Sequence, residues 1–210
     1  MILLNEIIIV LKTALPDLFI SGVFVYVAFQ IMKISLRFLK EAELEARIKA
    51  LLDDALIKTF GERLTVMKFY SHNRKVDFIP YNFMSCQYEV YKDGRKPVNN
   101  ILSQIPIALY MKFLLKLRDG YVILDTKHPN FKISEVGYDL VAAQGEAKAL
   151  CFMLKDSESK PIGYVSLKKD ENFSKKDIEV ISRLTTELSP LAEGWDDRKA
   201  KVFSGERKHA

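Results

Sequence analysis

The sequence has few of the residues that build metal centres and nucleophilic active sites. Its two cysteines, Cys86 and Cys151, lie far apart in apolar runs without CxxC or Cys/His spacing. They are therefore expected to be buried thiols, and no metal site or cofactor is predicted. The histidines His128 and His209 are isolated, and no repeat or low-complexity segment is present. The residue types favour a non-enzymatic protein.

A concentrated basic surface is also missing. The chain carries 32 Lys and Arg against 27 Asp and Glu, a net charge of +5 in 210 residues. These charges are mostly dispersed along the sequence, whereas a nucleic-acid-binding protein concentrates them in one patch. No nucleic acid partner is predicted.

A long uncharged run is present near the N-terminus. The stretch LFISGVFVYVAFQIM begins at residue 18, and extended to residue 36 it nearly spans a hydrocarbon core of about 30 Å. Lys33, Arg37 and Lys40 follow and can reach the lipid headgroups. We predict a transmembrane helix over 18–36, with membrane lipid as partner; the alternative is a buried or interfacial helix.

The flanking charges predict the orientation of this helix. Basic residues lie just after the span, whereas Lys12 alone precedes it, beside Glu6 and Asp17. By the positive-inside rule the C-terminal part faces the cytoplasm. A cleaved signal peptide is not expected, because the start MILLNE has no basic region. The predicted location is the inner membrane, with a single pass.

Residues 1–17 form a separate amphipathic segment, which Pro16 is expected to end. Asn5, Glu6, Lys12 and Thr13 lie on one polar stripe at helical spacing. An interfacial helix is one interpretation. The other is a helix that oligomerises within the membrane, so that its polar stripe faces neighbouring copies or water.

Residues 37–61 are predicted to form a long connector helix, since they are rich in strong helix formers. Leu44, Ile48, Leu51 and Ala55 form a short apolar stripe, which suits packing against the following domain or a brief dimer coil. Gly61 is expected to end the helix as a C-cap glycine.

Residues 62–195 alternate between strand and helix patterns. Strands are predicted at 63–72, 83–91, 121–125, 148–156 and 161–169, an interrupted helix at 101–117, and a final helix over 174–193. This order predicts an α+β domain, in which helices flank an antiparallel sheet. The basic tail, 196–210, is expected to be disordered.

The C-terminal half of this region resembles a GAF domain. Pro161-Ile162-Gly163, Lys169, and the helix start Phe173-Ser174-Lys175-Lys176-Asp177 fall in the order that this family shows. Ser174 and Asp177 also form a variant capping box, and Lys169 can pair with Asp177. The resemblance covers about residues 40–193 and implies a GAF/PAS-like sheet, with Gly163, Lys169, Phe173 and Asp177 as its structural motif.

The resemblance does not extend to the two best-defined ligand classes of the family. Leu167-Lys168-Lys169 and Ile178 stand where cyclic-nucleotide-binding members have an Asn-Lys pair and a Glu. Cys151 lies within a strand, not in a loop that could attach a bilin. In GAF-like folds the ligand sits between the sheet and the segments over it, so His72 and Asn73 are the candidate ligand-binding residues. Alternatively, both merely cap a turn.

Two functions from different classes follow. The first is a membrane-anchored, non-enzymatic sensory or interaction protein, whose GAF-like domain binds a small ligand or a protein partner. The second is suggested by architecture: a short N-terminal segment, one span and one GAF-like or PAS-like domain also resemble the T-type holins of phages, which permeabilise the inner membrane. Both readings predict a homo-oligomer.

Overall fold

The computed structural model describes residues 2–70, 81–99, 101–126 and 148–193, with side chains from residue 23 onward. The chain divides into two compact units, 1–46 and 47–210. In the described residues the first unit is helical, and the second holds the end of that helix and a six-stranded sheet. The predicted boundary at 61/62 therefore falls inside the second unit.

Helix α1 extends over Ile2–Thr59 without a break. Pro16 therefore does not interrupt the helix, and the division of α1 into segments stays a prediction. A proline removes one backbone hydrogen bond and crowds one turn, at a cost of about 3 kcal/mol, and the helical hydrogen bonds on either side keep the chain helical. Within the part of α1 whose side chains are described, no helix is both long enough and apolar enough to cross a bilayer. The span predicted over 18–36 begins ahead of that part.

The last turns of α1 pack on the sheet. Ile48, Leu52, Ala55 and Leu56 are buried, a spacing of 4, 3 and 1 residues that places them on one helical face. Of the predicted stripe, Leu44 and Leu51 are only half-buried. Leu52, which the predicted stripe omits, is fully buried, so the buried face of the helix lies about one residue further along the chain than predicted.

The end of α1 differs from the prediction by one residue. The N–H of Gly61 donates to the carbonyl of Leu56 at 3.1 Å, and that of Phe60 donates to Ile57 at 3.2 Å, which is the hydrogen bonding of a Schellman motif. The left-handed residue is thus Phe60, with φ 52°. Gly61 lies in a crowded position, since a β carbon there would lie 2.5 Å from a methyl of buried Leu167, which would have to shift.

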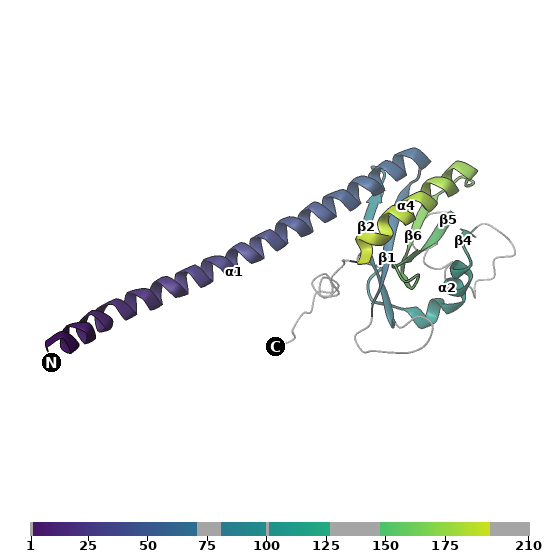
Figure 1. The fold of residues 1–210 in the computed structure, drawn as a ribbon. Coiled ribbons are helices and arrows are strands. Elements are labelled where there is room, and N and C mark those ends of the chain that lie inside the picture. Colours follow the sequence, from purple (N-terminus) through teal and green to yellow (C-terminus); the bar gives the residue numbers. More distant parts are fainter. Residues whose placement is uncertain (1, 71–80, 100, 127–147, 194–210) are drawn as a thin grey trace, which may run out of the picture. The chain divides into compact units, whose positions relative to one another are not determined.

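The sheet is antiparallel, with strand order β3-β2-β1-β6-β5-β4, and Figure 1 labels all of these strands except β3. Its strands are β1 (Arg63–Tyr70), β2 (Phe83–Tyr91), β3 (Ile105–Pro106), β4 (Tyr121–Asp125), β5 (Lys148–Lys155) and β6 (Pro161–Lys169). The predicted α+β class and the five longer strands are confirmed within one to two residues. β1 and β6 are the two central strands.

Helices cover both faces of the sheet. Helix α4 (Lys175–Glu193) contacts β5 and β6, and its Ile181, Leu184 and Leu188 are buried. On the other face η1 (Ile107–Tyr110) leads into α2 (Met111–Arg118), which contacts β4 and β5. Because successive strand residues point to opposite faces, each of the central strands contributes to both packing layers.

The helix predicted over 101–117 forms only from residue 107. Pro106 is extended (φ −63°, ψ 122°) and, with Ile105, pairs with β2 as the short strand β3. The carbonyl of Leu102 accepts a hydrogen bond from the N–H of Cys86 at 2.7 Å, and the N–H of Gln104 donates to Ser85 Oγ at 2.8 Å. Contacts with the edge of β2 thus keep residues 102–106 out of the predicted helix, and Ile105 and Pro106 are extended.

Candidate functional site

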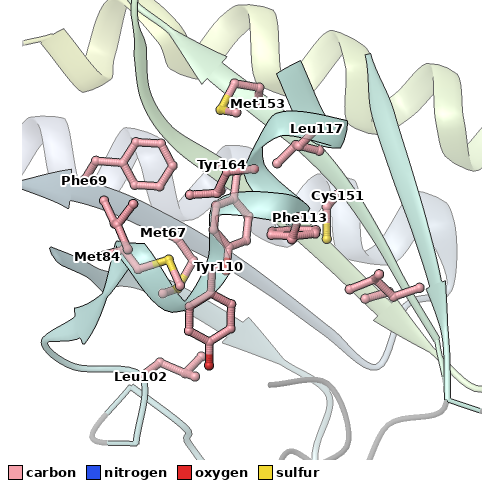
Figure 2. Close-up of a cluster of buried hydrophobic side chains, with 14 of the residues drawn as sticks. Met67, Phe69, Met84, Leu102, Tyr110, Phe113, Leu117, Cys151, Met153 and Tyr164 are labelled. Atoms are coloured by element: carbon pink, nitrogen blue, oxygen red, sulfur yellow. The ribbon is translucent and has the colours of Figure 1, made fainter. Parts of the chain in front are cut away.

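The face of the sheet beneath α2 carries a cluster of buried aromatic and sulfur-containing side chains, here called the α2-face cluster. Tyr164 lies at its centre, with the ring of Phe113 edge-on at 5.5 Å and that of Phe69 tilted at 6.2 Å (Figure 2). Aromatic pairs in these geometries add stability beyond the burial of their area. Its other members include Met67, Met84, Leu102, Tyr110, Leu117, Cys151 and Met153.

One end of the same sheet face is polar, although it is equally buried. Arg63 and Lys168 are each 2 % exposed and lie directly opposite one another across β1 and β6. Thr65 and Ser166 form the next pair on the same face, two residues along each strand, and both are buried. Together with Glu89 of β2, which is paired with Thr65, these residues form what we call the polar strip.

Glu89 organises the polar strip. Its side chain, 5 % exposed, forms an ion pair with Arg63. It also accepts hydrogen bonds from the N–H of Val98 at 3.0 Å and of Asn99 at 3.2 Å. A buried charge is costly unless it is paired and hydrogen-bonded, and Glu89 meets both conditions. No signal in the sequence singled out Arg63 or Glu89, because they are 26 residues apart and only the register of β1 and β2 brings them together.

Both cysteines lie on this face, and neither is activated. Burial, together with the nearby Glu89 carboxylate, raises the pKa of Cys86 to about 12, although Lys168 and Arg63 oppose this effect. Burial raises the pKa of Cys151 to about 11, and its thiol donates to Ser166 Oγ at 3.4 Å. Protonated thiols are weak nucleophiles. The chemistry available on this face is therefore hydrogen bonding and charge pairing, not covalent attachment.

Of the predicted motif residues, Gly163 has a steric role. A β carbon at this position would lie 2.1 Å from the carbonyl oxygen of Met67 in the paired strand. Because that atom belongs to the backbone, no side-chain rotation relieves the clash. Gly163 therefore permits the close approach of β6 to β1 beside the α2-face cluster.

The structure brings the other three motif residues together on the α4 side of the sheet. Lys169 Nζ lies 2.8 Å from Asp177 Oδ2 and 5.6 Å from the centre of the Phe173 ring. Asp177 also accepts hydrogen bonds from the N–H of Ser174 at 2.7 Å and from its hydroxyl at 3.0 Å, while its own N–H donates to Ser174 Oγ at 3.2 Å. This is the expected capping box, and it joins the end of β6 to the start of α4.

Charge pairing decides the ionisation of Asp177. Burial raises its pKa, but the hydrogen bond from Lys169, those from Ser174 and the Lys169 charge together lower it by more, so the carboxyl has a pKa below its ordinary value. Asp177 is thus an anion that holds a helix start, a structural role.

The remaining predicted residues are placed differently. His72 and Asn73 lie outside the described residues. Lys33, Arg37 and Lys40 are exposed on α1, and Arg37 forms an ion pair with Glu41 at 3.2 Å. Across residues 23–70, 81–99, 101–126 and 148–193, no three His, Cys, Asp or Glu side chains gather as metal ligands would.

Comparison with known proteins identifies the fold by structure and not by sequence. No family model and no curated protein matches the chain. Solved structures do, among them the photoproduct state of GAF3 from Slr1393 of Synechocystis, which is 12% identical with a TM-score of 0.55. The match covers 77% of this chain and 97% of that one.

Two further solved structures have a similar fold. The GAF domain of a two-component sensor histidine kinase from Bacillus halodurans is 15% identical with a TM-score of 0.52, over 76% of this chain and 97% of that one. A far-red-absorbing protein in its dark state, with bound biliverdin IXa, is 12% identical with a TM-score of 0.52, over 76% and 98%. The unit over 47–210 therefore has an α+β fold. Its fold is GAF-like, as the C-terminal sequence pattern predicted.

Proposed function

We propose that this chain is a non-enzymatic sensory or interaction protein. Its GAF-like domain binds a small ligand or a protein partner on the α2 side of the sheet and reports through α1. A separate protein produces the response to that signal. The GAF-like fold supports this proposal, and so does the bilin that one structural neighbour binds.

The proposal rests on one observation: β1 and β6 present buried side chains to both faces of the sheet. On one face these strands present Met67, Tyr164 and the polar strip. On the other, Leu64 and Leu167 are paired across the same two strands, and Leu167 lies close to Leu56 of α1 at the position of Gly61. A ligand that shifts these strands on the α2 side therefore also moves the surface on which α1 rests.

The experiment is a ligand screen on the full chain in detergent micelles, with thermal unfolding as the measurement. The panel contains purine nucleotides, cyclic nucleotides, haem and biliverdin. A true ligand at a hundredfold excess over its dissociation constant stabilises the domain by about 2.7 kcal/mol. On binding, the amides of residues 47–59 should also exchange more slowly with solvent. A ligand that stabilises the domain without this change at α1 would contradict the reporting step.

Matched variants locate the site. Ser166→Ala removes a buried hydroxyl from the polar strip and should weaken any ligand that is held there. Ser182→Ala makes the same change on the exposed side of α4 and should have no effect on binding. Alanine variants of His72 and Asn73 test the prediction that these two residues bind the ligand. Equal affinities in all of them would place the ligand elsewhere.

The proposal excludes covalent bilin attachment. Because the pKa values of Cys86 and Cys151 are raised to about 12 and about 11, both thiols are protonated at neutral pH. Biliverdin should therefore be removed completely by denaturing chromatography. A bilin that remains on the chain after denaturation would contradict the protonated state of the two thiols.

We also propose that α1 anchors the domain in the inner membrane, with the domain in the cytoplasm. Large apolar side chains on α1 support this, because Phe24 and Val25 are each at least 70% exposed. An isolated surface of this kind is unfavourable in water and suits hydrocarbon. The exposed Lys33, Arg37 and Lys40 follow it along the helix, as interfacial cations do.

Membrane anchoring is tested by fractionation and topology. The full chain should stay with the membrane after extraction at alkaline pH. A reporter enzyme that works only in the cytoplasm should be active when it is fused after Ala210. Release by alkali would contradict the anchor. Periplasmic reporter activity would contradict the orientation alone.

The holin alternative stays a prediction. No observation on the described residues favours it over a sensory role. The two differ in one measurement, since a pore former collapses the membrane potential after induced expression, whereas a single apolar helix gives ions no path.

A further inference from the structure

The side of η1 and α2 that faces away from the sheet combines exposed leucines with lysines. Leu109 of η1 is 57% exposed and Leu115 of α2 is 39% exposed, although the other side of α2 is buried. Lys112 and Lys116 are exposed as well. At 100° per residue they lie about 60° and about 100° from Leu115, so the three share one side of the helix. We call these four residues the α2 outer surface.

The charge of this surface is of one sign. The twelve residues of η1 and α2 include three basic side chains and no acidic one. Lys112 and Lys116 are four residues apart, and like charges at this spacing destabilise a helix. On α4 the same spacing holds Arg183 and Glu187, which pair at 2.9 Å. An anion outside the domain would offset the repulsion between the two lysines.

The position of α2 in the fold explains only part of this pattern. Basic residues near a helix C-terminus are favourable, which accounts for Lys116 and Arg118. Arg118 also forms an exposed ion pair with Asp119 at 3.4 Å. Neither effect accounts for Lys112 or for two exposed leucines on the same short segment.

We propose that the α2 outer surface binds the anionic surface of a lipid bilayer. Lysine ammonium groups attract the phosphates of anionic lipids, and exposed leucines enter the boundary between headgroups and acyl chains. A nucleic acid would contact the lysines and leave the leucines in water. A stable interface between proteins buries about 800 Å² on each partner, whereas the α2 outer surface consists of four side chains. An anionic bilayer accounts for both the lysines and the leucines.

The anchor proposed for α1 would strengthen this contact. The interfacial cations of α1 end at Lys40, and the unit that contains α2 begins at residue 47. Seven residues reach at most about 25 Å even when fully extended. Such a tether raises the local concentration of the domain at the bilayer, so a weak surface contact suffices. The inference rests on the proposed anchor for this effect alone, because the attraction comes from the α2 outer surface itself.

Fluorescence quenching on the full chain tests the contact. Ala108→Cys, at an exposed position of η1, carries a fluorophore, and the unsubstituted chain with its protonated thiols gives the background. The bilayers contain a spin-labelled quencher lipid in phosphatidylcholine, or in equal parts of phosphatidylcholine and phosphatidylglycerol. The label at 108 should be quenched several times more strongly in the anionic bilayer. A label on Ser182→Cys, exposed on α4, should be quenched equally in both.

Charge variants identify the residues responsible. A lysine near an anionic leaflet favours the bound state about fivefold, so Lys112→Gln with Lys116→Gln should weaken the contact about thirtyfold. Lys175→Gln with Lys176→Gln removes the same charge from the exposed start of α4 and should have no effect. Leu115→Gln keeps both lysines and should weaken the contact several-fold, which attraction by charge alone would not do.

Failure of the anchor and failure of this inference are distinguishable. If α1 is no anchor, the chain floats with anionic vesicles only, and the Lys112 and Lys116 variant abolishes flotation, which supports the inference. The inference is overturned if quenching at 108 is equal in the two bilayers, or if the Lys175 and Lys176 control loses as much as the α2 variant. It is also overturned if the label responds only to an acidic protein or a nucleic acid.

Discussion

The two faces of the sheet are buried to a similar degree but built from different residues. Towards α1 and α4 the central strands present aliphatic side chains, such as Leu64, Val165 and Leu167, to aliphatic residues of the helices. Towards α2 the same strands present aromatic rings and thioethers at one end and the polar strip at the other. The first face is mainly aliphatic and carries the Lys169–Asp177 pair where β6 leads to α4, whereas the second has the Arg63–Glu89 ion pair within the sheet itself.

This difference separates two kinds of stability. Aliphatic packing contributes in proportion to the area removed from water, and neighbouring residues can partly compensate for a loss. A buried ion pair contributes little net stability, but breaking it leaves a charge unpaired. The α2 face should therefore be the more sensitive of the two to a single polar substitution.

The largest effect is expected at Glu89. Glu89→Met removes the partner of Arg63 and the acceptor of the Val98 and Asn99 amides, so it should lower the free energy of unfolding by about 3–5 kcal/mol. Glu158→Met provides the control, because its pair with Lys160 is exposed and should change stability by less than about 0.5 kcal/mol. Urea denaturation of both variants makes the comparison. Similar losses would show that burial of the ion pair is unimportant.

A somewhat smaller effect is expected on the aliphatic face. Leu52 is fully buried between α1 and the sheet, so Leu52→Ala should cost about 3 kcal/mol from lost transfer energy and the cavity it leaves. Ile57→Ala, on the outward side of the same helix, should change the stability of the isolated chain by no more than about 0.5 kcal/mol. If both variants unfold at the same urea concentration, α1 does not rest on the sheet in solution.

The Asp177 pair should make this face dependent on pH. The pKa of Asp177 is lower in the folded state than its ordinary value of 3.8, so its contribution is present above that value and is lost as pH falls through the folded pKa. Asp177→Asn should therefore destabilise the domain by about 2 kcal/mol at pH 7, and the difference from the unsubstituted chain should shrink below about pH 4. A difference that stays constant from pH 7 to pH 3 would contradict the charge pairing.

The smallest effect has the opposite sign. Phe60→Gly relieves a left-handed residue and should raise the stability of the isolated domain by about 0.5–1 kcal/mol, the strain relieved being partly offset by the greater freedom of glycine when unfolded. Phe60→Ala removes the ring but keeps the β carbon, so it should not stabilise. Thermal unfolding at high dilution measures both. A stabilised Phe60→Ala would mean that the exposed ring, and not the backbone, carries the cost.

The sequence was most informative where structure is decided locally. Turn residues and alternating apolar positions located the strands from residue 148 to 169, where Asp156 Oδ1 closes the hairpin by accepting hydrogen bonds from the N–H groups of Glu158 and Lys160. The Ser174 capping box also involves residues only three apart. Such features depend on residues that are close together in the chain, so they can be predicted from the sequence.

Features that depend on distant segments were missed. The pairing of Arg63 with Glu89 follows from the register of two strands, and contacts with β2 keep residues 102–106 out of the predicted helix. Phe60 was missed for another reason: glycine is the usual left-handed residue, and Gly61 was assigned that role although Leu167 restricts its space. The predicted ligand residues His72 and Asn73 remain predictions.

The segment along β2 has a consequence for solubility. An open sheet edge offers unpaired backbone groups to any other extended chain and is a common starting point for aggregation. Here the carbonyl of Leu102, the N–H of Gln104 and the two residues of β3 occupy that edge. Pro106 lacks an N–H group and the following residues turn into η1, so the two-residue strand cannot template another. The same contacts that override a helical pattern therefore protect this edge of the sheet from misassembly.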